Sequence, residues 1–189
     1  MKILVTGGAS GLGKAIVELL AAQGHHLVIT YHSSIDSANA LKERLNVTTL
    51  QCDFHSKESI AKLQEQIESL DLDILINNAL PKFDKKHFHK QTPQTFIDSF
   101  QHSVYPILCI TKTAIRQFRK KKFGKIINIL SSVIINKPPI GWSVYTANKA
   151  YLLSMNKTWA TENAKYNITS NAISPAFMDT SLNLSLIHI

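Results

Sequence analysis

The chain has 189 residues, of which 44% are hydrophobic and 18% are charged, a composition that suits one globular domain with a sizeable core. Its formal net charge of +8 is compatible with an anionic ligand or partner, but no nucleic-acid motif accompanies the charge, so we expect no nucleic-acid binding. No apolar run reaches the roughly 18 residues of a membrane span, and the N-terminal run is too short for a signal peptide. Cys52 and Cys109 have no metal-binding or redox spacing, which predicts no metal site and a reducing, cytoplasmic setting.

Short apolar runs and amphipathic stretches alternate along the chain. The apolar runs predict strands at residues 3–5, 26–31, 47–52, 74–76, 125–130 and 168–173. The spacing of apolar residues predicts helices at 15–22, 37–45, 56–70, 92–119 and 144–166, and Pro106 can kink the fourth. The polar stretch 81–91 is expected to be a loop. This alternation predicts an α/β fold of the Rossmann type, a doubly wound parallel sheet with helices on both faces and the ligand at the carboxyl ends of the strands.

A glycine-rich stretch, Thr6-Gly7-Gly8-Ala9-Ser10-Gly11-Leu12-Gly13-Lys14, lies between the first predicted strand and the first predicted helix. Glycines let the backbone approach a ligand closely, and the N–H groups at a helix start attract phosphate. The spacing from Gly8 to Lys14 also fits a P-loop, but Ala15 stands where that loop needs Ser or Thr for magnesium. Taken alone, the stretch is also compatible with an ordinary tight turn.

Tyr145 and Lys149 are four residues apart in a predicted helix, so both side chains project from one face. A free tyrosine has a pKa of about 10, too high for efficient proton exchange near neutral pH, and a neighbouring ammonium group lowers that pKa. Tyr145 is therefore a candidate acid and base for a carbonyl oxygen, and Ser132, just beyond the fifth predicted strand, is a candidate to hold the same oxygen. Without further motifs, such a pair is more often a half-buried tyrosine beside a solvated lysine.

In their order and context, the motifs resemble those of short-chain dehydrogenases/reductases. The matching positions are a TGxxxGxG loop at 6–13, Asp53, Asn77-Asn78-Ala79, Ser132, Tyr145, Lys149 and a PGxxxT-like segment at 175–180. The resemblance covers residues 2–183 and implies one NAD(P)-binding Rossmann domain over 1–183. It also implies an oxidoreductase that interconverts a carbonyl and a secondary alcohol. In the implied chemistry, Tyr145 is the acid and base, Lys149 lowers its pKa and binds the cofactor ribose, and Ser132 orients the carbonyl.

The resemblance also implies a cofactor site. In it, Asp53 would bond the adenine amino group, although this residue could instead cap the following helix. Asn77 and Ala79 would line the adenosine side, and Pro175 and Thr180 would contact the nicotinamide half. The full set implied is Thr6, Gly7, Ser10, Gly11, Leu12, Gly13, Tyr31, His32, Ser33, Asp53, Phe54, Asn77, Asn78, Ala79, Tyr145, Lys149, Pro175 and Thr180.

The end of the second predicted strand bears on the choice of cofactor. Members of the family that prefer NAD usually carry an acid there, which bonds the ribose 2′-hydroxyl. Here that place is held by Tyr31, followed by His32 and Ser33, which can hydrogen-bond a 2′-phosphate. We therefore expect NADP(H) to be favoured over NAD(H).

Three positions depart from the family pattern. Leu80 and Ala176 replace glycines, and Ser103 stands where the family often has an asparagine that holds a water in a proton relay. Ser103 can still hold a water, so we keep it among the catalytic candidates. The departures leave open a different function, that of a catalytically weak dinucleotide-binding sensor or interaction protein.

The basic run from Arg116 to Lys125 suits a helix C-terminus, where cations complement the dipole. A second interpretation is a docking surface for an acidic acyl carrier protein, as in the similar 3-oxoacyl carrier protein reductases, so the carbonyl substrate is either a small molecule or carrier-bound. The family pairs its long helices, which predicts a homodimer or homotetramer. Family members continue into a further strand, so we expect the last strand to be missing, and residues 184–189 resemble a non-native tail.

Overall fold

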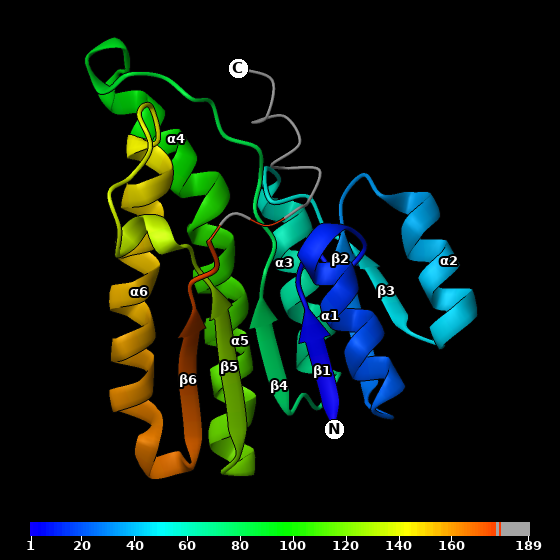
Figure 1. The fold of residues 1–189 in the computed structure, drawn as a ribbon. Helices are drawn as coiled ribbons and strands as arrows, with labels where there is room; N and C mark the ends of the chain where they lie inside the picture. The colour runs from blue at the N-terminus through cyan, green and yellow to red at the C-terminus, as the bar shows by residue number, and fades with distance from the viewer. Residues whose placement is uncertain (177, 179–189) are drawn as a thin grey trace.

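The computed structural model describes residues 1–176 and 178. Its centre is a six-stranded sheet in the order β3-β2-β1-β4-β5-β6, in which every neighbouring pair is parallel (Figure 1). The strands are β1 (Lys2–Val5), β2 (His26–Tyr31), β3 (Thr48–Gln51), β4 (Ile74–Asn77), β5 (Gly124–Ile129) and β6 (Ile168–Ile173). The predicted doubly wound α/β fold is confirmed.

Helices cover both faces of the sheet, as a parallel sheet requires. They are α1 (Gly11–Ala22), α2 (Ile35–Leu45), α3 (Lys57–Glu68), α4 (Pro93–Ser103), α5 (Tyr105–Lys121) and α6 (Ser143–Asn163). One apolar cluster joins the sheet to α1 and α2, and includes Val5, Val17 and Leu41. A larger cluster joins the opposite face to α3, α5 and α6, and includes Leu63 and Phe118. Since strand side chains alternate between faces, the single sheet serves both cores.

The strand order reverses direction next to β1. The chain moves outward from β1 through β2 to β3, then returns to place β4 on the other side of β1 and continues to β5 and β6. Ligands of open α/β sheets bind in the crevice at the carboxyl ends of the strands at such a switch point. The glycine-rich stretch follows β1 at this place. The chain leaving β4 also passes this edge before it reaches α4 (Figure 1).

The predicted single helix over 92–119 is wrong in one respect, because the structure contains two helices. The first, α4, ends at Ser103, and α5 starts at Tyr105 with Pro106 in its first turn. Proline fits a first turn because its missing N–H has no helical partner there. The interruption therefore falls at Val104, before the proline, and not at a kink centred on it. Short 3₁₀ turns also occur at Phe88–Lys90, Ser132–Ile134 and Ala164–Tyr166.

Within the described residues, no helix combines the length and the apolar character needed to cross a bilayer. In the same part of the chain, β6 is an edge strand of the sheet. The predicted cofactor residue Thr180, the domain end at 183 and the tail 184–189 lie outside the described residues.

Candidate active site

The glycine-rich loop has the geometry of a phosphate cradle. Gly7 and Gly11 have φ values of +64° and +50°, which glycine adopts without strain. A Cβ on Gly13 would lie 2.2 Å from the Gly7 carbonyl oxygen and 2.5 Å from Nδ2 of Asn78, so only glycine fits. Helix α1 begins at Gly11, and the Ser10 side chain makes no capping hydrogen bond. The first N–H groups of α1 therefore face the carboxyl edge without a side-chain cap, which fits an anionic ligand.

Thr6 and Asn78 hold this loop against β4. The Thr6 Oγ1 accepts hydrogen bonds from the backbone N–H groups of Asn78 at 2.9 Å and Ala79 at 3.0 Å. In return, Asn78 Nδ2 donates to the carbonyl oxygens of Thr6 at 3.0 Å and Gly7 at 3.2 Å. Thr6 is fully buried. The Thr6 side chain therefore positions the loop. Its hydroxyl is engaged by the backbone after β4 and not by the direct cofactor contact that the resemblance implied.

Asn77 was also expected to line the adenosine side, and here the structure corrects the prediction. Its Nδ2 donates to the Thr111 hydroxyl and to Asn128 Oδ1, both at 2.9 Å, in a buried network beneath α5. Consecutive residues at a strand end point to opposite faces, so Asn78 faces the glycine loop and Asn77 faces away from it. The Asn77 side chain ties β4 to β5 and α5. The Phe54 side chain is likewise part of the core beside α3.

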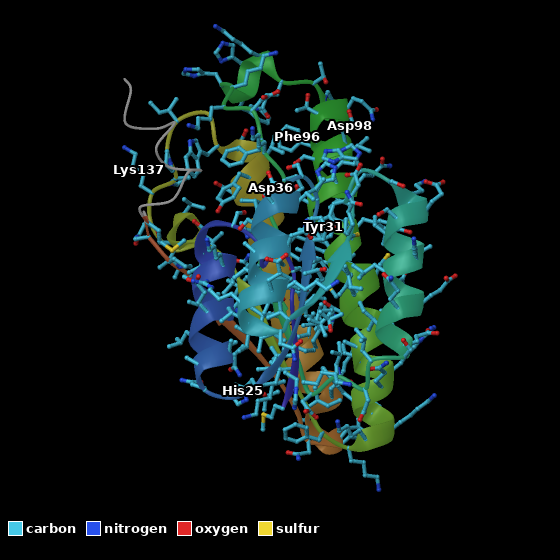
Figure 2. The ribbon with its side chains drawn as sticks, turned by 90° about the vertical axis from the view of Figure 1, so that its right-hand side faces the viewer. His25, Tyr31, Asp36, Phe96, Asp98 and Lys137 are labelled. Carbon is cyan, nitrogen blue, oxygen red and sulfur yellow. The ribbon has the colours of Figure 1, made fainter. Side chains whose placement is uncertain are left out.

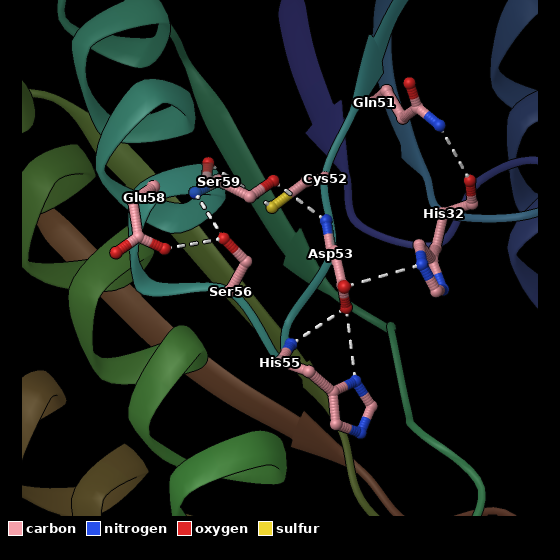
Figure 3. A network of polar contacts seen from close by, with 8 residues as sticks. All are labelled: His32, Gln51, Cys52, Asp53, His55, Ser56, Glu58 and Ser59. Carbon is pink, nitrogen blue, oxygen red and sulfur yellow. Dashed lines mark hydrogen bonds and ion pairs between the residues drawn. The ribbon is translucent and has the colours of Figure 1, made fainter.

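Asp53 is the centre of a polar network at the carboxyl end of β3 (Figure 3). Its Oδ1 accepts hydrogen bonds from the His55 backbone N–H at 2.9 Å and pairs with the His55 ring at 3.1 Å. Its Oδ2 lies 3.7 Å from Nε2 of His32. The backbone hydrogen bond from His55 is the main reason that the pKa of Asp53 lies below its ordinary value, despite partial desolvation. Asp53 is therefore an ionised acceptor at this edge, flanked by two histidines.

Tyr31, His32 and Ser33 lie where the sequence predicted them, at the carboxyl end of β2. Figure 2 shows Tyr31 at one end of the sheet and His25, just before β2, at the other. His32 and Ser33 are exposed. The nearby Asp36 lies in the first turn of α2.

Tyr145 and Lys149 are both buried near the start of α6. The Lys149 Nζ donates to the Ile129 carbonyl oxygen at 2.7 Å and lies 5.8 Å from the centre of the Tyr145 ring. Burial lowers the pKa of Lys149 to about 8. Burial also raises the pKa of Tyr145, and a hydrogen bond with the Ser131 side chain only partly opposes this. The structure therefore places the Tyr145 pKa above its ordinary value, opposite to the expected net fall, because desolvation outweighs the hydrogen bond from Ser131.

The serine whose side chain acts on the Tyr145 pKa is Ser131, which sequence reasoning did not single out. The predicted Ser132 begins the following 3₁₀ turn, and its backbone N–H donates to the Pro175 carbonyl oxygen at 2.9 Å. This bond brings the end of β6 to the edge of the site. The sequence offered two adjacent serines, Ser131 and Ser132, as candidates for this contact. The spacing to Tyr145 favoured Ser132.

Ser103 shares a pocket with the tyrosine and the lysine. The pocket is narrow, with a cavity volume of about 10 Å³, and is lined by residues of α4, α5, α6 and the segment after β4. Ser103, Tyr145 and Lys149 all line it, as does Leu80. A further lining residue, Asn148, donates from Nδ2 to the Ser99 hydroxyl at 2.9 Å. The relay role of Ser103 stays a prediction, with its position beside Lys149 in its favour.

The basic run lies far from this pocket along the sheet. It falls at the C-terminal end of α5, which leads into the start of β5, whereas the start of α6, which carries Tyr145, lies beside the carboxyl edge (Figure 1). Arg119 bonds Asn163 at 2.7 Å, and Lys121 pairs with Asp71 and Asp73. These contacts favour a structural role and give no support to docking of a carrier protein at this run. Across residues 1–176 and 178, no cluster of three or more His, Cys, Asp or Glu side chains is placed to hold a metal ion.

A parallel sheet with a glycine loop at its switch point and a buried tyrosine–lysine pair at the same edge defines a dinucleotide-binding oxidoreductase fold. The sequence matches the short chain dehydrogenase family over residues 1–188. The chain belongs to the short-chain dehydrogenase/reductase family, whose members act on carbonyl and alcohol groups.

Curated relatives and solved structures agree with this assignment. The chain is 34% identical over 183 residues to 3-oxoacyl-[acyl-carrier-protein] reductase FabG of Haemophilus influenzae and 33% identical to acetoacetyl-CoA reductase of Shinella zoogloeoides, covering 95% of this chain and 74% of each relative. A short-chain dehydrogenase of Sphingobium yanoikuyae in complex with NADPH superposes with a TM-score of 0.84 at 26% identity, covering 96% of this chain and 73% of that one. A bulky-bulky ketone specific alcohol dehydrogenase of Comamonas testosteroni gives a TM-score of 0.84 at 27% identity, covering 95% and 74%.

Proposed function

We propose that this protein is a cytoplasmic, NADP(H)-dependent oxidoreductase that interconverts a carbonyl group and a secondary alcohol. The observation that carries the proposal is the burial of Tyr145 and Lys149 side by side at the carboxyl edge, next to a glycine loop that fits a phosphate. Bound nicotinamide cofactor supplies the hydride for reduction or accepts it in the reverse direction. The chain itself provides the proton and the positioning.

In the proposed reduction, the Tyr145 hydroxyl donates a hydrogen bond to the carbonyl oxygen and then transfers its proton as hydride reaches the carbonyl carbon. The products are a secondary alcohol and the oxidised cofactor. The Lys149 ammonium stabilises the phenolate that remains, an effect strengthened by the low polarity of its surroundings. Ser132 is proposed to orient the carbonyl oxygen, and the Ser131 side chain is proposed to hydrogen-bond the phenol.

The preference for NADP(H) rests on the end of β2. The three residues at this strand end are Tyr31, His32 and Ser33, none of which is a carboxylate, and His32 and Ser33 are exposed and can hydrogen-bond a ribose 2′-phosphate. The relative from Sphingobium yanoikuyae was solved with NADPH, which supports the same choice. Relatives named for 3-oxoacyl and acetoacetyl substrates make a 3-oxo ester the first substrate class to test.

Self-association is proposed through the helices α4, α5 and α6. Three large apolar side chains are exposed on these helices, namely Ile97, Tyr105 and Tyr151. A homodimer or homotetramer would bury them, and light scattering of the purified protein gives the mass directly. A monomer at micromolar concentration would contradict this assignment.

The experiment follows the absorbance of NADPH or NADH during reduction of ethyl acetoacetate and related 3-oxo esters. We expect turnover with NADPH at least tenfold more efficient than with NADH. Binding of NADPH without turnover of any carbonyl compound would favour the alternative of a dinucleotide-binding sensor, and absence of binding to either cofactor would contradict both.

A further inference from the structure

Two aromatic rings, one from the loop after β4 and one from the start of α6, pack around the ring of the proposed acid Tyr145. The Phe83 ring stacks on the Tyr145 ring, with ring centres 4.6 Å apart and planes at 20°. Trp142 presents an edge-on contact to both rings, at 5.2 Å from Tyr145 and 5.1 Å from Phe83. With Val133 they form a small apolar cluster, separate from the two main cores. One face of Tyr145 is therefore covered by a ring that lies 62 positions away in the sequence.

The segment that carries Phe83 is fastened to the chain on the other side of the site. The backbone N–H of Lys86 donates to the Gly141 carbonyl oxygen at 3.1 Å. Further along, the Ser143 hydroxyl donates to Oε1 of Gln91 at 3.2 Å. These two bonds join the loop 81–91 to the start of α6. They hold the Phe83 ring in place over the Tyr145 ring. We call the surface formed by Phe83 and Trp142 the aromatic wall of the site.

Resting on the proposed function, we propose that Phe83 and Trp142 determine substrate specificity by selecting carbonyl compounds with a flat apolar group beside the carbonyl carbon. A carbonyl oxygen that bonds the Tyr145 hydroxyl has its two substituents close to this wall. The wall offers ring faces and edges, and Leu80 and Ile134 pack against it. Aromatic rings gain from offset-stacked and edge-on contacts beyond the burial of their area, which corresponds to roughly twofold to tenfold tighter binding.

The lining of the neighbouring pocket favours the same choice. Phe83 and Leu80 line the pocket together with Ile107 and Leu152, so apolar side chains continue inward from the aromatic cluster, and the polar part of the lining is Ser99, Ser103, Asn148 and Lys149. Lys85 also contacts the aromatic cluster, with its Nζ 5.9 Å from the Trp142 ring centre. The cationic side chain therefore contacts the indole ring of Trp142, and the side chains that form the wall are aromatic. A polar or charged substituent placed against it would lose its hydration without gaining a partner.

The test compares two 3-oxo esters that differ only beside the keto group. Ethyl benzoylacetate carries a phenyl group there and ethyl acetoacetate a methyl group. In Phe83→Leu, which keeps apolar volume but removes the ring, we expect the ratio of kcat/KM for the phenyl ester to that for the methyl ester to fall about tenfold. Phe88→Leu is the matched control, because Phe88 is on the same loop but its ring faces Phe96, at 6.0 Å. An equal loss on both esters, or an unchanged ratio, overturns the proposal.

A binding measurement separates this inference from the proposed function. Ethyl benzoylacetate is titrated into the protein with its bound cofactor while tryptophan fluorescence is followed, and Trp142→Phe identifies the part of the signal that comes from Trp142. If the wild type turns over neither ester, the proposed oxidoreductase function fails. Phenyl-ester binding that is about tenfold weaker in Phe83→Leu still supports the aromatic wall. Binding that is absent, or that is equal in both proteins, overturns it.

Discussion

Replacing Lys149 by methionine should change how stability depends on pH. The ordinary lysine pKa is 10.5 and burial lowers that of Lys149 to about 8. Between these values the unfolded chain binds more protons than the folded one, so the free energy of unfolding of the wild type rises with pH. The destabilisation by the buried ammonium is fully present below pH 8 and is lost as the pH approaches 10.5.

The size of the effect follows from the two pKa values. Each pKa unit corresponds to about 1.4 kcal/mol, so the buried ammonium costs about 3 kcal/mol at pH 7, most of which disappears by pH 10. Methionine removes that cost, but it leaves the Ile129 carbonyl oxygen, which accepts from Nζ at 2.7 Å, without its donor. Losing that partner costs about 1–3 kcal/mol at every pH. Lys149→Met should therefore match or exceed the wild-type stability at pH 7 and fall behind it at pH 10.

Urea denaturation of both proteins at pH 7 and pH 10 measures this difference. We expect the wild type to gain about 2–3 kcal/mol relative to Lys149→Met over that interval. Lys157→Met is the control, because Lys157 is exposed on the same helix, and its difference from the wild type should change by less than about 0.5 kcal/mol. A Lys149→Met difference that is constant across the pH range would refute the burial of an ionisable amine at this position.

Three further substitutions test the parts of the site. Gly13→Ala should weaken NADPH binding at least tenfold, measured by calorimetry, because its Cβ would lie 2.2 Å from the Gly7 carbonyl oxygen. Gly24→Ala is the control, because a Cβ there would have no atom within 4 Å and should leave the affinity unchanged. Equal affinities of the two variants would contradict the phosphate cradle. Thr6→Val should lower the free energy of unfolding by about 2–4 kcal/mol, because two partly buried N–H groups lose their acceptor. A loss no larger than that of the exposed Thr48→Val would count against the tie to β4. Tyr31→Asp should move cofactor preference toward NADH at least tenfold in kcat/KM, because a carboxylate accepts a bond from the 2′-hydroxyl and repels a 2′-phosphate; an unchanged preference would remove the end of β2 from cofactor selection.

Much of the fold could be predicted because it follows from the local spacing of apolar residues along the sequence. Short apolar runs separated by amphipathic stretches allow few topologies other than a doubly wound parallel sheet. The glycine loop was predictable for the same reason, because its glycines are required locally: a Cβ on Gly13 would collide with the Gly7 carbonyl oxygen. The pair Tyr145 and Lys149 was predictable from its helical spacing only together with the other motifs that resemble the family pattern.

Features set by tertiary contacts were not predictable in this way. Which of Asn77 and Asn78 faces the loop depends on the register at the end of β4, and which of Ser131 and Ser132 reaches Tyr145 depends on the turn after β5. At the end of β4, a one-residue difference reverses the face to which the side chain points. Sequence motifs identify the segment that contributes to the site, but which of two neighbouring residues faces the site depends on tertiary packing.

The direction of the Tyr145 pKa is a further case. The neighbouring lysine is visible in the sequence, and its charge alone would lower the pKa. The desolvation that raises it comes from burial, to which Phe83 and Trp142 contribute through tertiary packing. The location of the basic run at the far end of α5 is another property that only the topology reveals.

The most direct test of the central claim, that Tyr145 is the acid and base of a carbonyl reductase, is Tyr145→Phe in the NADPH-dependent reduction of a 3-oxo ester. Removing a general acid costs about 10²–10⁴-fold in rate, so we predict a fall in kcat of at least a hundredfold with an NADPH dissociation constant within twofold of the wild type. Tyr151→Phe, an exposed tyrosine on the same helix, should retain full activity. A Tyr145→Phe variant that keeps more than a tenth of the wild-type kcat would contradict the account.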